Sequence, residues 1–235
     1  MARERKNWYR RWFAEEGYLG LHLVIGFVVA LAGGVFFKMI ADEVLRHPGI
    51  RSLDADAQSL AAALQSPYLT SVMHFVTFFG SGWILTALSI AIGLALLFAG
   101  SHRRLYTFGA IMAGGNLLNA LMKDVFHRVR PTEVIPLVTA RGYSFPSGHA
   151  MGAMLFFGGL AYVLFFTMQR HPVWRVLGLF LCLAAAILVG ASRVYLGVHY
   201  LSDVVAGLVA GLGWIGICVS GTEVWIRWRA GRRRE

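Results

Sequence analysis

Charged residues are scarce in this sequence. They make up 14% of its 235 residues, and only 12 residues are acidic. Soluble domains carry about 25% charged and about 45–50% apolar residues. Here 57% of the residues are hydrophobic and the mean hydropathy is +0.60. This composition excludes an ordinary soluble core and favours a helical membrane protein, expected to form one membrane-embedded domain over residues 1–235.

Cysteine is almost absent as well. Cys182 and Cys218 each lie inside an apolar run and form no CxxC pair, so no disulfide framework is expected. The excess of basic residues, a formal net charge of +10, flanks apolar runs and is not interleaved with aromatic residues. A nucleic-acid partner is therefore not expected, and the expected partner is the membrane itself.

Six apolar stretches are long enough to cross a bilayer, which takes roughly 20 mostly apolar residues. They cover about 18–40, 69–99, 105–122, 148–168, 173–191 and 200–226. The second exceeds one span, and Gly80, Ser81 and Gly82 are expected to divide it into a lead-in helix and a membrane helix. The expected fold class is all-α: a polytopic membrane protein with six transmembrane helices in one bundle.

The segment 53–64 predicts a short interfacial helix between the first two spans. Its apolar residues Leu53, Ala57, Leu60 and Leu64 recur at helical spacing, as in an amphipathic helix lying on a membrane surface.

The distribution of basic residues indicates the orientation of the chain. With the N-terminus inside, fourteen of the 22 basic residues fall in inner segments and eight in outer ones. We expect basic cytoplasmic tails at 1–17 and 227–235 and a multi-pass location in a bacterial cytoplasmic (inner) membrane. The N-terminus resembles a signal peptide, but its apolar run continues to Ile40, which favours an uncut anchor helix.

Three polar stretches break the apolar pattern, and all three fall on the outer, periplasmic or extracellular, side. They are the segment 123–131, the segment 146–149 and a third containing Ser192, Arg193, His199 and Asp203. Ionisable residues at a membrane edge are costly and mark function.

Part of this set suits a phosphoryl group. Lys123, Arg130 and Arg193 supply three cations for phosphate oxygens. Ser147 stands where a helix N-cap belongs, so free N–H groups near Ser147, Gly148 and His149 would point at a bound anion. Gly148 lets the anion approach the backbone closely.

The remaining residues suit phosphate ester hydrolysis. His199 and Asp203 are four apart and would share one face of a helix, where the carboxylate fixes the imidazole tautomer and leaves the other nitrogen free to attack. His149, on another helix, would protonate the leaving oxygen. These three residues could instead bind a metal, but three cations around one carboxylate would repel it, so we expect no metal and no cofactor.

Other polar residues have simpler interpretations. Lys38, Arg46, Arg51 and Arg128 are expected to snorkel to the interface. Arg141 is either a lipid head-group contact or a solvated loop residue. Exposed polar positions are expected for the other histidines: His22, His47, His74, His102, His127 and His171.

The three polar stretches read Lys123-x6-Arg130-Pro131, Pro146-Ser147-Gly148-His149 and Ser192-Arg193-x5-His199-x3-Asp203. This pattern resembles the signature of the type-2 phosphatidic acid phosphatase superfamily. All eleven fixed letters match, over a motif core of 123–203. The resemblance implies a metal-free mechanism through a phosphohistidine. It implies that His199 is the nucleophile, Asp203 its partner and His149 the acid, and that the phosphate is bound by Lys123, Arg130, Ser147, Gly148 and Arg193.

The lipid substrate stays open: phosphatidylglycerophosphate, phosphatidic acid, undecaprenyl pyrophosphate and lipid A are all compatible, and so is any oligomeric state. A lipid phosphotransferase would use the same site. Vanadate-dependent haloperoxidases share the signature but are soluble. A channel or transporter would need more polar residues in mid-membrane than Asn116 and Asn119, which we expect to be interior hydrogen-bonding residues.

Overall fold

The computed structural model describes the backbone of residues 15–46 and 49–232, and the side chains of residues 24–46, 49–222, 224 and 225. Within these ranges the chain forms helices and no strands. The helices are α2 (Glu15–Arg46), α3 (Gly49–Ala63), α4 (Pro67–Phe78), α5 (Gly82–Phe98), α6 (His102–Phe126), α7 (Gly148–Thr167), α8 (Pro172–Tyr195) and α9 (Leu201–Arg232). The basic tails expected at 1–17 and 227–235 lie outside the described side chains.

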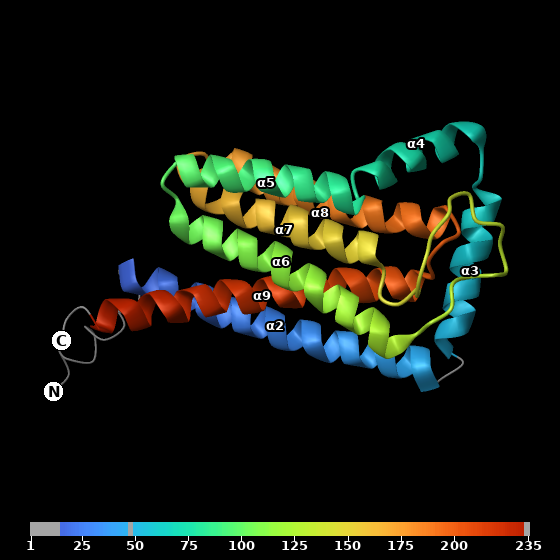
Figure 1. Ribbon diagram of the computed structural model, residues 1–235, viewed down its shortest axis with the longest axis horizontal. Helices are drawn as coiled ribbons and strands as arrows, with labels where there is room; N and C mark the ends of the chain where they lie inside the picture. Colours follow the sequence, from blue (N-terminus) through green and yellow to red (C-terminus); the bar gives the residue numbers. More distant parts are fainter. Residues whose placement is uncertain (1–14, 47–48, 233–235) are drawn as a thin grey trace.

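Figure 1 shows α3 crossing one end of a bundle of helices that run side by side along the long axis of the molecule: α2, α5, α6, α7, α8 and α9. The helix α4 is bent by 46° from α5, and the break at residues 79–81 overlaps the expected division at Gly80–Gly82, although Gly82 already begins α5. The loop from residue 127 to 147 lies at the same end as α3 (Figure 1).

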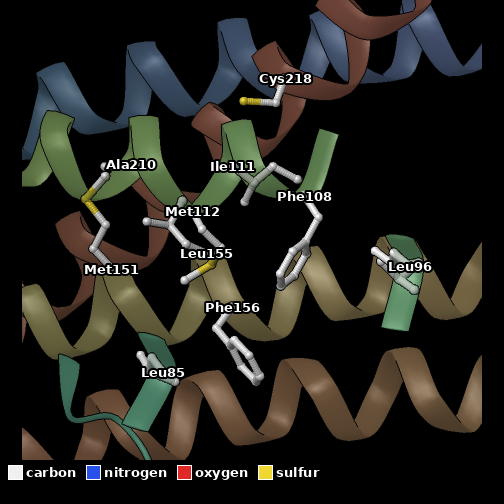
Figure 2. Close-up of a cluster of buried hydrophobic side chains, with 11 residues drawn as sticks. Leu85, Leu96, Phe108, Ile111, Met112, Met151, Leu155, Phe156, Ala210 and Cys218 are labelled. Carbon is white, nitrogen blue, oxygen red and sulfur yellow. The ribbon is translucent and has the colours of Figure 1, made fainter. Parts of the chain in front are cut away.

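The core forms around α7, whose first half carries an unbroken run of buried residues from Ala150 to Phe156. Met151, Leu155 and Phe156 of α7 pack against Phe108 and Ile111 of α6 (Figure 2). Close approach of α9 to the start of α7 depends on a glycine: a Cβ at Gly207 would lie 2.7 Å from the carbonyl oxygen of Ser147. Packing thus brings the beginnings of α7 and α9 together at the α3 end.

The expected all-α membrane bundle is confirmed, but the count of six spans is not. Within the described residues, four helices are long and apolar enough to cross a membrane, and the bent pair α4 and α5 makes a fifth if it acts as one span. The 25-residue helix α6 falls outside this group, and Asn116 and Asn119 lower its hydropathy. The sixth span therefore stays a prediction.

The two asparagines differ in their surroundings. Asn119 is buried and its amide donates to Sδ of Met151 at 3.3 Å, as expected of an interior residue. The expectation for Asn116 is wrong: its side chain is exposed and donates to the carbonyl of Met112, one turn back in the same helix.

The interfacial helix exists, as α3, but it turns a polar face to the protein. Asp54, Gln58 and Ala61 are its buried residues, whereas Leu53 and Leu60 are 62% and 61% exposed. At 3.6 residues per turn, the leucine side lies about a quarter turn around the helix from the buried side. A helix that crosses the end of a membrane bundle can thus meet the protein with one side and lipid with another.

Candidate active site

The three polar stretches meet at the end of the bundle that α3 crosses. Lys123 lies in the last turn of α6 and Arg193 in the last turn of α8, while Asp203 lies in the first turn of α9. Arg130 and His199 lie in the loops that precede α7 and α9. Antiparallel neighbours therefore bring together residues that are up to 80 positions apart in the sequence.

His199 is 2% exposed, and its two ring nitrogens face different groups. Nδ1 lies 3.4 Å from Oδ2 of Asp203, and Nε2 lies 3.2 Å from Nη1 of Arg130. A carboxylate at Nδ1 favours the tautomer whose lone pair is on Nε2. The nitrogen beside the cation is thus the one available for attack.

One detail of the expected arrangement is wrong: His199 does not share a helix face with Asp203, because α9 begins at Leu201. Instead the Asp203 carboxylate reaches back and accepts the N–H of Tyr200 at 2.9 Å. This contact resembles half of a capping box. It closes the turn that places His199 beside Asp203.

Asp203 is fully buried, and its oxygens accept further donors. Ser144 donates its hydroxyl to Oδ2, and Arg128 donates Nη1 to Oδ1 at 2.6 Å. The sequence reading missed Ser144 and assigned Arg128 to a snorkelling role, which is wrong: its side chain is only 15% exposed and pairs with two carboxylates. The sequence motifs do not reveal these contacts, because Arg128 and Ser144 lie far from Asp203 in the sequence.

The three expected cations are all present, and each is held by the protein. Arg130 donates to the carbonyls of Arg141, Gly142, Tyr143 and Val198 at 2.7–3.4 Å. Lys123 donates Nζ to the Tyr143 carbonyl at 2.8 Å. Arg193 is 5% exposed and donates Nη1 to Oγ1 of Thr77 at 2.7 Å. Thr77, near the end of α4, is a contact that the sequence did not suggest.

Ser147 is the N-cap of α7, as expected, and its hydroxyl accepts the N–H of Ala150 at 3.4 Å. Its own N–H is not free for an anion, because it donates to the carbonyl of Asp203 at 3.0 Å. That part of the expectation is wrong. The N–H groups of Gly148 and His149, in the first turn, have no intrahelical acceptor and keep the geometry of an anion site.

His149, in the first turn of α7, lies in the same electrostatic environment as the three cations. Its half-buried imidazole interacts with the charges of Arg193, His199, Arg130 and Lys123. The site thus combines two imidazoles, three cations and a helix N-terminus, which is what binding and cleaving a phosphate ester requires.

Two loop residues, His199 and Arg130, have a pKa below the ordinary value for their side chains. Burial lowers the pKa of His199 to about 4; the Asp203 carboxylate opposes this shift, and Arg130 and Arg193 reinforce it. Burial also lowers the pKa of Arg130. The imidazole of His199 is therefore neutral near pH 7, as a nucleophile must be.

The other polar expectations have mixed outcomes. Lys38, Arg46 and Arg51 are exposed, and so are His74, His102, His127 and His171. The side chain of Arg141 is exposed while its carbonyl accepts from Arg130, so both interpretations of Arg141 stay open. His47 and the side chain of His22 lie outside the described part of the chain.

Comparison with known proteins shows the family of the chain. The model of the PAP2 superfamily matches residues 104–227. The chain belongs to the PAP2 superfamily. It is 33% identical over 187 residues to phosphatidylglycerophosphatase B of Bacillus subtilis, covering 76% of this chain and 87% of that protein. It is also 35% identical over 121 residues to lipid A 1-phosphatase of Rhizobium etli, covering 48% and 47%.

Solved structures of the family share the fold. A PAP2-type phosphatidylglycerolphosphate phosphatase from Bacillus subtilis superposes with a TM-score of 0.72 at 31% identity, covering 82% of this chain and 94% of that one. LpxE of Aquifex aeolicus superposes with a TM-score of 0.55 at 22% identity, covering 72% and 94%. The resemblance drawn from the motif is confirmed, and with it membership in a family of membrane lipid phosphatases.

Proposed function

We propose that this protein is a metal-independent membrane phosphatase that hydrolyses a phosphate monoester or pyrophosphate of a lipid through a phosphohistidine at His199. The observation that carries the proposal is the placement of His199: Nδ1 faces Asp203, and Nε2 faces Arg130. A phosphate bound by Arg130 would lie next to the attacking lone pair, and such positioning is a large part of catalysis.

In the first step, the lone pair on Nε2 attacks phosphorus and the bond to the leaving oxygen breaks. His149 gives its proton to that oxygen, so the lipid leaves as a neutral alcohol or as a protonated phosphate. In the second step, water attacks the phosphohistidine while His149 accepts a proton, and the P–N bond breaks. Inorganic phosphate leaves and His199 is restored.

Charge develops on the equatorial phosphate oxygens in both steps. Lys123, Arg130 and Arg193 provide positive charge there, and Ser147 and Gly148 begin the helix whose N–H groups point at the anion. Preorganised charge of this kind usually supplies the largest catalytic term. It also argues for a metal-independent reaction, because a divalent cation would compete with three fixed cations for one carboxylate.

The relatives suggest where to look for the substrate. Phosphatidylglycerophosphatase B of Bacillus subtilis matches over most of its length, so we propose phosphatidylglycerophosphate as the first lipid to assay. Phosphatidic acid, undecaprenyl pyrophosphate and lipid A complete the panel. We further propose a bacterial inner-membrane location with the site facing the periplasm or outside, since the basic residues of the tails favour the opposite side.

The test is phosphate release by the purified protein from each lipid in mixed micelles, with His199→Ala as the control. We expect release from at least one lipid by the wild type and none above background by the variant. Mass spectrometry of the lipids distinguishes hydrolysis from transfer of the phosphoryl group to a second lipid. Equal release by both proteins, or none from any lipid, would contradict the proposal, as would halide oxidation with added vanadate in place of hydrolysis.

A further inference from the structure

The helix α3 reaches the catalytic residues through its buried polar side. Asp54, 2% exposed, accepts Nη2 of Arg128 on Oδ2 at 2.8 Å. The same carboxylate accepts the N–H of Ser202 at 2.9 Å and its hydroxyl at 2.7 Å. A buried carboxylate is tolerated when it is paired and hydrogen-bonded in this way. Asp54 therefore fixes both Arg128 and the first turn of α9.

Arg128 lies between two buried carboxylates. Nη2 contacts Asp54, while Nη1 donates to Oδ1 of Asp203 at 2.6 Å and to Oγ of Ser202 at 2.7 Å. The guanidinium also stacks over the Tyr200 ring, 4.1 Å from its centroid. A planar fork can serve two acceptors and a ring at once, which a lysine ammonium cannot.

A second contact joins α3 to the other half of the catalytic pair. Gln58, one turn after Asp54 and 3% exposed, donates Nε2 to the carbonyl of His199 at 2.8 Å. One helix thus holds His199 by its main chain and Asp203 through Arg128.

We propose that Asp54, Arg128 and Gln58 are positioning residues that aim the His199–Asp203 pair, so that α3 sets the geometry of the nucleophile. The inference rests on the proposed function, because it assumes that His199 attacks. Oδ2 of Asp203 lies 3.4 Å from Nδ1 of His199, and the contact from Arg128 to Oδ1 restrains the carboxylate from rotating away from the imidazole. A displacement of about 1 Å at a reacting group can cost about 10²-fold in rate.

The pH dependence of kcat/KM depends on the charges around His199, so it provides a measurement that a purely structural role of these residues would not change. The groups that face His199 are Asp203 from α9, Arg130 from the preceding loop, Arg193 from α8 and His149 from α7. Of these, only Asp203 carries a negative charge, and that charge favours the protonated imidazole. His199 must be neutral to attack, so kcat/KM falls at low pH as its imidazole is protonated; this fall is the acid limb of the pH profile. Any change that strengthens or weakens the electrostatic field of Asp203 at His199 therefore shifts the pH of the acid limb.

The two charged positioning residues are expected to move that limb in opposite directions. Arg128→Gln leaves the charge of Asp203 less compensated, so the acid limb should shift to higher pH. Asp54→Asn leaves the charge of Arg128 less compensated, so the limb should shift to lower pH. With nitrophenyl phosphate as substrate, we expect each variant to lower kcat about 10- to 100-fold and KM to change only a few-fold.

Three further variants separate positioning from folding. Arg128→Lys keeps the charge but not the fork, so kcat should lie between those of wild type and Arg128→Gln, with the acid limb unmoved. Gln58→Ala removes one hydrogen bond and no charge, so kcat should fall several-fold without a shift of the limb. Asp56→Asn is the matched control, because Asp56 lies on the same helix, α3, and is exposed; it should behave as wild type.

Thermal unfolding of each variant accompanies the kinetics. If Arg128→Gln does not fold, Asp54→Asn and Gln58→Ala decide the question. Wild-type kcat and pH profile in those two variants, or shifts of the acid limb in the same direction for Arg128→Gln and Asp54→Asn, would overturn the inference while leaving the phosphatase activity intact. Failure of the proposed function looks different, because the wild-type protein would then release no phosphate.

Discussion

Nη1 of Arg130 lies 3.2 Å from Nε2 of His199, on the opposite side of the ring from Asp203. The nitrogen proposed to attack phosphorus is therefore the one beside a cation proposed to bind the phosphate. A phosphoryl group that exchanges places with this direct contact would meet a lone pair already oriented by the Asp203 carboxylate.

Replacing His149 and replacing His199 should impair the reaction in different ways. A lipid alkoxide needs a proton to leave, whereas nitrophenolate does not, and general acid catalysis contributes about 10²–10⁴-fold. His149→Ala should therefore slow phosphorylation by nitrophenyl phosphate much less than by a lipid. Because the second step still needs a base, this variant should accumulate an acid-labile, base-stable phosphoenzyme, detected after quenching with radiolabelled substrate.

The companion variants define the roles. His199→Ala should abolish turnover of both substrates and trap no phosphate, and Asp203→Asn should lie between the two because its imidazole is present but no longer oriented. Trapped phosphate on the His199 variant, or equal loss of both substrates in the His149 variant, would show that the roles are misassigned.

The acid limb of kcat/KM should lie near pH 4, not near the ordinary imidazole pKa of about 6.5. Burial lowers the pKa of His199 to about 4, so the imidazole is protonated and unreactive below that pH and neutral above it. The phosphate of the substrate also loses its second proton near pH 6. This ionisation is measured separately, and kcat/KM is corrected for it. Asp203→Asn removes the group that raises this pKa, so its limb should move lower. A wild-type acid limb at pH 6.5 would argue against the buried imidazole as nucleophile. Full recovery of activity on return to pH 7 is the control that the loss at low pH is reversible titration.

Chelation should leave the activity intact. Lys123, Arg130 and Arg193 already supply the positive charge that a divalent ion would bring. Phosphate release should therefore be unchanged in excess EDTA, and orthovanadate should inhibit because its five-coordinate adduct with His199 resembles the transition state. Activity that disappears with EDTA and returns with a divalent ion would contradict this.

Labelling of single cysteines tests the orientation. In a background with Cys182 and Cys218 replaced by alanine, a thiol at Thr139 should react with an impermeant reagent added to intact cells. One at His102, at the opposite end of the bundle, should react only after lysis. Both positions are exposed in the structure, so access to the reagent depends on the membrane and not on burial. The reverse pattern would invert the topology.

Two nearby glycines offer a matched test of packing next to His149. A Cβ at Gly80, in the break between α4 and α5, would lie 2.2 Å from Cγ1 of Val189 and 3.4 Å from Cδ2 of His149, whereas one at Gly82 would meet nothing within 4 Å. Gly80→Ala should destabilise the protein by about 1–3 kcal/mol through overpacking. It should also lower kcat for lipid substrates, by displacing His149. Gly82→Ala should change neither thermal stability nor kcat appreciably, and equal effects of the two changes would argue against this role of the break.

Local features of the sequence were enough for much of the site. The spacing from Lys123 to Arg130, the N-cap at Ser147 and the break at Gly80 are properties of short segments, so they could be recognised without a fold. The lengths of the apolar runs predicted the all-helical bundle for the same reason. The asparagines of α6 mark the limit of this approach, since composition alone does not tell buried Asn119 from exposed Asn116.

Only the tertiary structure decided how His199 and Asp203, the proposed catalytic pair, are held. Arg128 contacts Asp203 across 75 positions, and Asp54 contacts Ser202 across 148. By composition, Asp54 and Gln58 belong to the polar side of an amphipathic helix, which on a soluble protein would face water. Here that side is buried, because α3 crosses the end of a bundle whose unpaired helix ends and catalytic groups need polar partners, while its leucines remain exposed on the side available to lipid.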